Sequence, residues 1–389
     1  MTDGDKSADR PISISDTSGT SLLRLARVSR DAARKKLRGL ADEEQARACL
    51  ELRAEVRAEF LMLLDHPEHV VPLFGDAEVC VTVRGSGMAD GAWLLELATP
   101  EQRQACFDLD CWKGPKLELE RTAEWVDALI EAGPETLARV VAETDAEIWV
   151  LLLRSMTAIA VLGKEETPPD GSFSVDGVVH FTPHEGSDPS RIQQLARALA
   201  GYSPDEYWRL VYGAIFESPS EMEEYAQRWR SGRLADLGFP EREQALGVYA
   251  RLHPDQAPVL DVSTPGAALI PTRTLPRQLQ GSLVGESLRK LSPDRAGEVL
   301  GYLLAVANAL AVADDLVLSD PEAVPVALEK AVRGIDVGLR ELSRVRGRPP
   351  EEVLDRTLPF DLFRIGATLD ASLRKQWVDP DDEAEAGKE

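Results

Sequence analysis

The sequence predicts a mainly all-α fold, built of stacked helical-hairpin or superhelical units with one small β-hairpin insertion. Three observations support this prediction. Alanine, leucine, glutamate and arginine dominate most of the chain, and these residues are strong helix formers. One helix-start signal recurs three times along the sequence. A single stretch combines a turn signal with short runs of alternating β-forming residues, which predicts one hairpin.

The first 40 residues divide into a polar tail and a basic segment. Residues 1–20 contain little that can be buried, so we expect a disordered tail there. Leu22 to Leu40 has apolar residues at helical spacing and cationic residues between them, which predicts one basic amphipathic helix. Its candidate contact residues are Arg24, Arg27, Arg34 and Arg38. Such a helix can lie on an anionic membrane surface, bind an acidic partner or RNA, or dock on the acidic body of this chain or of a second copy.

Three segments carry the helix-start signal. A hydroxyl residue at the N-cap is followed by proline at the first helical position and an acid in the first turn, at Thr99-Pro100, Ser203-Pro204 and Ser292-Pro293. Gln102 and Glu206 stand where a capping box requires them. Trp125 and Trp229 each follow the proline of their segment by 25 residues, which suggests an internal duplication.

The remaining boundaries follow from breaks in the helical pattern. We expect the basic helix and an N-terminal helical repeat unit over residues 21–163, and a linker with a β-hairpin at Asp176-Gly177 over 164–189. A second helical unit is expected over 190–253, a proline-rich connection over 254–279, a C-terminal helical unit over 280–378 and an acidic tail over 379–389. The longest apolar runs, 148–162 and 299–313, are too short to cross a bilayer and are expected to be buried core helices.

Charge and cysteine content limit the partners and the compartment. The net charge of −23 argues against nucleic acid as the partner of the body, because phosphate binding needs clustered cationic charge. The charge is uneven, since residues 1–38 carry +4 and residues 379–389 carry −5. Four cysteines without CxxC spacing, and an N-terminus without an apolar signal segment, predict a cytoplasmic protein with reduced thiols.

The block Asp108-Leu109-Asp110-Cys111-Trp112 has two interpretations. Asp108 and Asp110 can form the acidic edge of an interaction groove with Trp112 as its aromatic anchor. Alternatively, Leu109 and Trp112 are core residues of a helix that ends at Gly114, with the two aspartates in solvent.

Two segments resemble known families. At ATPEQRQACFDLDCWKG (98–114) and LPFDLFRIG (358–366), the chain resembles an uncharacterised family of bacterial cytosolic helical proteins, and the Leu-Asp-Cys-Trp block is the most specific part. This resemblance implies a helical fold and no particular activity. LLELATPEQ (94–102) is similar, more weakly, to the helical repeats of MgtE-type N-terminal domains and FliG-type proteins, which implies a superhelical, protein-binding character.

No set of residues suited to catalysis, metal binding or cofactor binding converges in the sequence. His66 and His69 are separated by Pro67, and no nucleophile or phosphate-loop motif is complete. We therefore expect a non-catalytic cytosolic scaffold or adaptor that binds protein partners, with self-association open and no cofactor. The alternative is a divalent-cation or small-ligand sensor or enzyme, in which Asp108, Asp110, Asp314 and Asp315 converge in a cleft between units.

Overall fold

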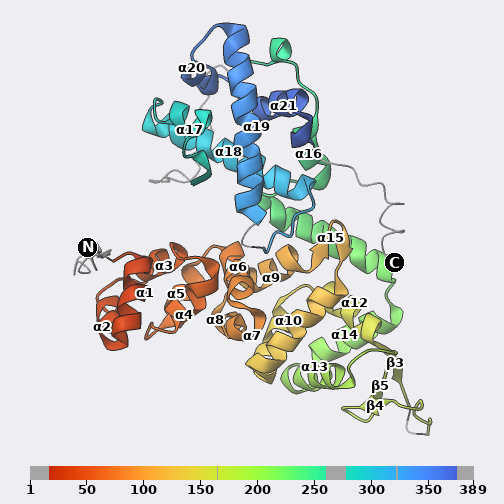
Figure 1. The fold of residues 1–389 in the computed structure, drawn as a ribbon. Helices are drawn as coiled ribbons and strands as arrows, with labels where there is room; N and C mark the ends of the chain where they lie inside the picture. The colour runs from red at the N-terminus through yellow and green to blue at the C-terminus, as the bar shows by residue number, and fades with distance from the viewer. Residues whose placement is uncertain (1–16, 164, 260–276, 321–322, 375–389) are drawn as a thin grey trace, which may run out of the picture. The chain divides into compact units, whose positions relative to one another are not determined.

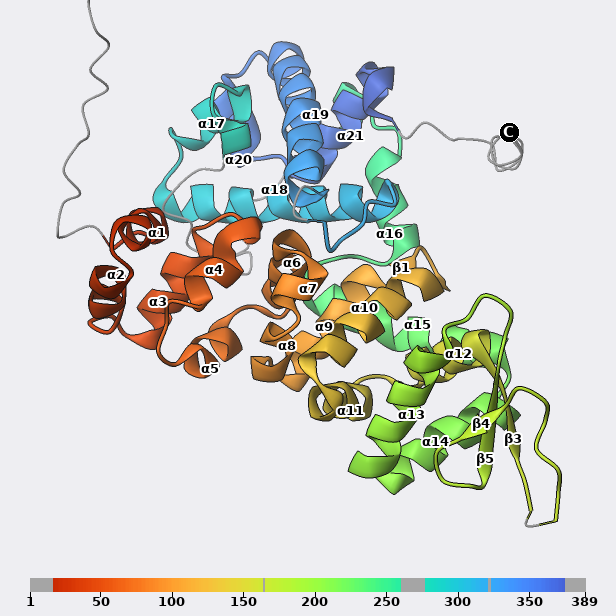
Figure 2. The same cartoon turned by 60° about the horizontal axis from the view of Figure 1, so that its bottom comes forward.

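A computed structural model describes residues 17–163, 165–259, 277–320 and 323–374. It divides into two compact units, with the boundary between Arg228 and Trp229 (Figures 1 and 2). The described residues are mainly α-helical, and two small antiparallel sheets account for the strands. The predicted fold class, all-α with a small β insertion, is therefore confirmed.

Unit 1 begins with a series of short helices packed on one another (Figure 2). Their bounds are α1 (Gly19–Val28), α2 (Arg30–Leu37), α3 (Asp42–Leu50), α4 (Arg57–Leu61), α5 (Pro67–Val70), α6 (Asp76–Ser86), α7 (Met88–Gly91) and α8 (Leu94–Leu97), with 3-10 turns η1 (Ala54–Val56) and η2 (Val71–Leu73).

The single basic helix predicted for Leu22 to Leu40 is wrong. Ser29 has an extended backbone (φ −151°, ψ 102°) and separates α1 from α2. Its side chain accepts a hydrogen bond from the Ala32 amide at 3.3 Å, so it caps the second helix. Leu22 and Leu37 are buried, one on each side of this break.

The second half of unit 1 holds longer helices and both sheets. The helices are α9 (Pro100–Asp110), α10 (Leu119–Ala132), α11 (Pro134–Glu143), α12 (Ala146–Met156), α13 (Pro189–Tyr202) and α14 (Pro204–Phe216). Helix α15 (Pro219–Asp236) continues across the unit boundary. The Thr99 capping box forms as predicted, with Gln102 N–H to Thr99 Oγ1 at 3.2 Å and Thr99 N–H to Gln102 Oε1 at 2.9 Å. At α14 only the Ser203 half forms, because the Glu206 carboxylate pairs with Arg209.

The strands form in two places. Strands β1 (Trp112–Lys113) and β2 (Lys116–Leu117) form a short hairpin around Gly114, whose φ is +57°. Strands β3 (Thr157–Val161), β5 (Val179–Pro183) and β4 (Phe173–Ser174) form an antiparallel sheet in that order. The turn between β4 and β5 contains Gly177 with φ +78°, as the Asp176-Gly177 signal predicts.

Strand β3 overturns the interpretation of 148–162 as one core helix. Helix α12 ends at Met156, and Thr157 to Val161 continue as a strand paired with β5. The segment alternates β-branched residues with alanine, which suits a pleated surface better than a helix. A short apolar run is ambiguous between the two structures until a pairing partner is known.

Unit 2 packs around two long helices. Its elements are α16 (Arg242–Leu246), α17 (Leu283–Leu288), α18 (Pro293–Ala313), α19 (Ala323–Arg346), α20 (Pro350–Asp355) and α21 (Pro359–Leu369), with 3-10 turns η3 (Gly247–Tyr249), η4 (Pro254–Gln256), η5 (Arg277–Leu279) and η6 (Ala371–Leu373). Helices α19 and α21 pack closely at Gly338, whose lack of a side chain allows the backbone of α21 to approach. A Cβ at Gly338 would overlap the Leu362 carbonyl. The tails 1–16 and 375–389 and most of the proline-rich connection lie outside the described residues.

Among the described helices, α18 alone has the length and composition to span a membrane, and half of its apolar window is buried inside the structure. The run 299–313, predicted to be too short to cross a bilayer, is the C-terminal part of this 21-residue helix, so the prediction from its length is wrong. Burial of Leu303, Val306 and Leu310 agrees with its expected place in the core.

Candidate functional site

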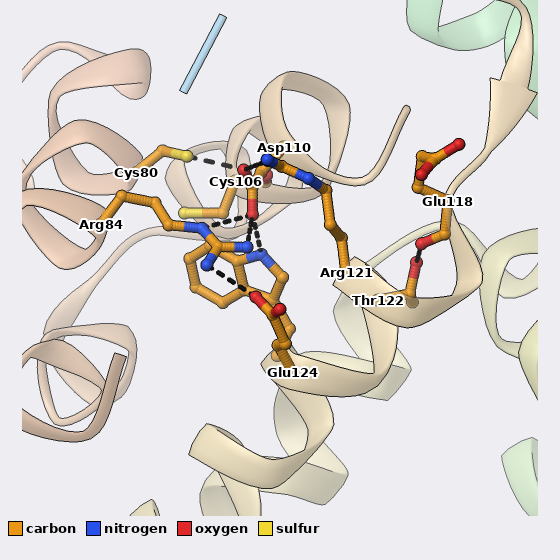
Figure 3. A network of polar contacts seen from close by, with 9 residues as sticks. Cys80, Arg84, Cys106, Asp110, Glu118, Arg121, Thr122 and Glu124 are labelled. Atoms are coloured by element: carbon orange, nitrogen blue, oxygen red, sulfur yellow. Dashed lines mark hydrogen bonds and ion pairs between the residues drawn. The ribbon is translucent and has the colours of Figure 1, made fainter. Parts of the chain in front are cut away.

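The Asp110 carboxylate is the centre of a buried polar network in unit 1 (Figure 3). Asp110 is the last residue of α9, and its side chain has no exposed surface. It accepts hydrogen bonds from Arg84 Nε of α6 at 2.5 Å, from Arg121 Nη1 of α10 at 2.7 Å and from Trp125 Nε1 of α10 at 2.7 Å. One carboxylate therefore joins three helices.

Arg84 is the main cationic partner in this network. Its guanidinium also bonds Glu124 at 2.8 Å and lies over the Trp125 ring at 5.6 Å. Burial opposes its charge, but hydrogen bonds to Asp110 and Glu124 outweigh that effect and raise the pKa of Arg84. With its oxygens occupied and its surface covered, Asp110 is placed to hold helices together.

Asp108 and Trp112 are buried beside this network. Gln104 Nε2 donates to Asp108 Oδ1 at 3.0 Å, and Gln104 Oε1 accepts from the Asp145 amide at 2.8 Å. Trp112 opens strand β1 and is 8% exposed. Both interpretations of the block placed the aspartates at the protein surface, and this is wrong, since Asp108 and Asp110 are each 1% exposed. The helix also ends at Asp110, before Gly114.

All four cysteines are buried and reduced. Burial raises the pKa of Cys49 to about 12 and raises the pKa of Cys80 and Cys111 well above that of a free thiol. Cys80 Sγ donates to the Cys106 carbonyl at 3.7 Å, within the same region as Asp110 (Figure 3). Cys49, Cys80 and Cys111 therefore stay protonated, and all four buried cysteines serve as small core residues.

Two of the four predicted basic residues contact residues farther along unit 1. Arg24 and Arg27 of α1 are exposed. Arg34 Nη2 donates to the Met62 carbonyl at 3.5 Å, and Arg38 Nε bonds Asp65 at 2.5 Å. The hydrogen bond from Arg38 lowers the pKa of Asp65. Part of the basic segment thus contacts the chain's own unit 1.

The other acidic candidates are each held by a cation. In unit 2, Asp314 accepts from Lys330 Nζ at 2.6 Å and from the Tyr249 hydroxyl at 2.6 Å. Asp315 pairs with Arg242. Within the described parts of the chain, no group of three or more His, Cys, Asp or Glu side chains is placed to hold a metal ion.

A groove of about 880 Å³ runs along α14 in unit 1. Its walls come from the start of α12, the outer face of α14 and the first half of α15. Helices α12 and α14 touch at its floor, where a Cβ on Gly213 would lie 2.8 Å from Val150 Cγ2. The volume is in the range of sites that take a small molecule or a row of side chains.

Three aromatic rings form a ladder on α14. Trp208 and Tyr212 stack with centroids 5.3 Å apart, and Tyr212 and Phe216 stack at 6.0 Å. Tyr212 is 50% exposed and Phe216 is 76% exposed, and both line the groove. The opposite face of α14 buries Leu210 and Val211. Exposed aromatic rings grouped beside a groove are typical of a binding surface.

The groove is acidic. Its lining includes four glutamates, Glu147, Glu217, Glu221 and Glu224, and two arginines, Arg209 and Arg228. Arg209 is already paired with Glu206, outside the lining. The walls therefore carry a net negative charge.

The residues that line this groove were not among the predicted site residues, although the spacing of the aromatic residues on α14 is visible in the sequence. Residues 208, 212 and 216 recur every four positions, which places them on one helical face. Trp125 and Trp149 are fully buried, whereas Trp229 is 56% exposed. Trp125 and Trp229, the two tryptophans of the proposed duplication, therefore occupy different environments.

Comparisons with known proteins give a family and no activity. No curated protein matches the chain, and no solved structure matches it. The model of a family of unknown function, DUF6178, matches residues 34–378, which is most of the chain. The resemblance to an uncharacterised family is therefore confirmed at this level, and the protein belongs to the DUF6178 family.

Proposed function

We propose that this protein is a non-catalytic scaffold or adaptor, and that its α14 groove binds an amphipathic helix from a protein partner. The observation that carries the proposal is the ladder of Trp208, Tyr212 and Phe216, in which Tyr212 and Phe216 are exposed and line the 880 Å³ groove. A helix laid in a groove presents apolar side chains at positions i, i+3 or i+4, and i+7, which is close to the every-fourth-residue spacing of the ladder. Aromatic residues supply much of the binding energy at such interfaces.

Charge complementarity specifies the partner further. Glu217, Glu221 and Glu224 lie on the groove walls and are exposed. A partner helix with lysine or arginine flanking its apolar stripe places cations against these carboxylates. Binding to this surface is expected to weaken as salt rises, because exposed charges are screened.

A synthetic peptide tests the proposal. A fluorescent amphipathic helix of leucine and lysine is titrated with the full chain, and anisotropy reports binding. A second peptide, with glutamate in place of each lysine, controls for charge. We expect the lysine peptide to bind and the glutamate peptide to bind at least about tenfold more weakly, since close like charges cost more than one kilocalorie per mole.

Two protein variants locate the binding surface. Tyr212→Ala should weaken peptide binding by about 5- to 30-fold, the effect of truncating an aromatic hot spot worth about 1–2 kcal/mol. Tyr202→Ala is the matched control, because Tyr202 is 48% exposed on the same unit and does not line the groove. Equal binding by both variants, or no binding of the lysine peptide to the wild-type chain, would refute the assignment of the groove.

A further inference from the structure

Strand β3 has one unused edge. In the sheet order β3-β5-β4, β3 lies at the side, and among the described residues it pairs with β5 alone. Figure 2 shows it at the outer side of the sheet, beyond β5 and α14. A strand edge of this kind presents backbone donors and acceptors to any strand that can pair with it.

The ladder with β5 decides which backbone groups face outward. The Leu162 amide donates to the Val178 carbonyl at 2.9 Å, and the His184 amide donates to the Met156 carbonyl at 2.9 Å. Even-numbered residues therefore bond to β5, and odd-numbered residues direct their N–H and C=O groups away from it. Ile159 and Val161 present both groups outward, whereas the Thr157 amide is used by the Leu153 carbonyl of α12.

The sequence of β3 does not protect this edge. Thr157-Ala158-Ile159-Ala160-Val161 contains no charged residue, no proline and no glycine. Natural edge strands are usually blocked by charged residues, by proline or by a bulge. An open, apolar edge is therefore a feature that needs a partner strand to explain it.

We propose that the β3 edge binds the β3 edge of a second copy of this chain, with the two strands antiparallel about a two-fold axis at Ile159. The residue pattern is symmetric about Ile159, with alanine on each side and a β-branched residue beyond each alanine. In this register the Ile159 amide donates to the Ile159 carbonyl of the second copy. The Val161 amide bonds to the Thr157 carbonyl of the second copy, which is one of the outward groups.

Side-chain exposure along β3 fits the same register. Thr157 is 3% exposed next to α12, whereas Val161 at the far end is 41% exposed. Antiparallel pairing sets the exposed Val161 of each copy beside the covered Thr157 end of the other. The exposed end of one strand thus gains a covered neighbour, which a parallel pairing does not provide.

The net negative charge of the chain opposes this association. Two copies of net charge −23 repel each other, and salt screens that repulsion. Self-association through the apolar edge should therefore strengthen as salt rises, opposite to the trend expected for a basic peptide in the α14 groove. This difference lets the two proposals fail separately.

Analytical ultracentrifugation of the full chain, under reducing conditions and over a range of concentrations and salt, tests the proposal. Val161→Pro removes an outward N–H and leaves the β5 ladder intact, because proline is tolerated at an edge position. Val161→Lys adds a charge to the edge. Val178→Lys is the matched control, since Val178 is 39% exposed and precedes the inner strand β5.

We expect wild type and Val178→Lys to form dimers with similar dissociation constants, and both Val161 variants to raise that constant at least about tenfold. Amide hydrogen exchange of wild type gives a measurement that needs no variant, because exchange at Ile159 and Val161 should slow as the dimer forms. A wild-type chain that stays monomeric, exchange at these amides that does not change on association, or equal effects of Val161→Lys and Val178→Lys would overturn the proposal.

Discussion

Replacing Asp110 by asparagine should destabilise unit 1 strongly. The substitution keeps the size of the side chain and removes the negative charge that faces Arg84 and Arg121. Arg121 is 36% exposed in its side chain and can reach water, but the Arg84 side chain is only 18% exposed. The amide NH₂ of asparagine also replaces an acceptor with a donor. Breaking one side of a buried ion pair costs about 3–5 kcal/mol, so we expect a loss in that range.

Glu124→Gln is the matched control for this variant. Glu124 bonds the same Arg84 guanidinium at 2.8 Å, but its side chain is 55% exposed. Exposed ion pairs contribute about 0–1 kcal/mol, so this variant should stay close to wild type.

Amide hydrogen exchange measures the difference within unit 1, which matters because a chain of two units need not unfold in a single step. Protection of α6, α9 and α10 should fall by about 10²–10⁴-fold in Asp110→Asn, since each 1.4 kcal/mol is a factor of ten. Far-UV circular dichroism at low denaturant checks that both variants are folded. If amide protection were the same in Asp110→Asn as in Glu124→Gln, the Asp110 carboxylate would not stabilise unit 1 as its buried contacts indicate.

Two further predictions concern packing and pH. Gly338→Ala should lower the free energy of unfolding of unit 2 by about 1–3 kcal/mol or more, because its Cβ meets the Leu362 carbonyl. Gly297→Ala, where nothing lies within 4 Å of the added Cβ, should raise it by about 0.5–1 kcal/mol. Urea unfolding of both variants checks the opposite signs. Because burial raises the pKa of Cys49 from 9.0 to about 12, its stabilising contribution is complete below pH 9 and is lost as pH rises toward 12. Stability should fall by about 1.4 kcal/mol per pH unit in that window from this thiol, and Cys49→Ala should reduce the slope measured by urea unfolding; an unchanged slope would contradict the assignment.

Local signals in the sequence predicted local structure well. Thr99, Ser203 and Ser292 cap the helices that they were expected to begin, and Gly177 lies in the expected hairpin turn. These features depend on a few neighbouring residues, so no tertiary information is needed to find them. The break at Ser29 was missed because apolar spacing continues across it, although a serine is a common N-cap.

Contacts between distant residues were the part that sequence could not supply. Asp110 is placed beside Arg84 and Trp125 by the packing of three helices, and no local pattern shows that an aspartate flanked by apolar residues is buried with cations. Charged residues are seldom fully buried unless paired, so solvent exposure was the reasonable expectation. Strand β3 was missed for the same reason, since its partner β5 lies about twenty residues further along the chain.

The α14 ladder shows a different limit. Its aromatic spacing is visible in the sequence, but spacing alone does not distinguish an outward face from a buried one. Tyr207 and Trp208 are neighbours on α14, and the structure buries the first and leaves the second half-buried beside the groove. The packing of α12, α13 and β3 against α14 determines which face remains open.

The Asp110 network also bears on how the chain folds during synthesis. Its ion pairs and hydrogen bonds join residues no more than 40 positions apart, from Arg84 to Glu124. Contacts of short sequence separation close at low entropic cost, and domains form as they leave the ribosome from the N-terminus onward. The segment that contains this network is complete well before α17 to α21 have been translated. Unit 1 can therefore bury its charged centre while most of unit 2 is still unsynthesised, and protease resistance of ribosome-bound chains stalled beyond residue 228 would measure this directly.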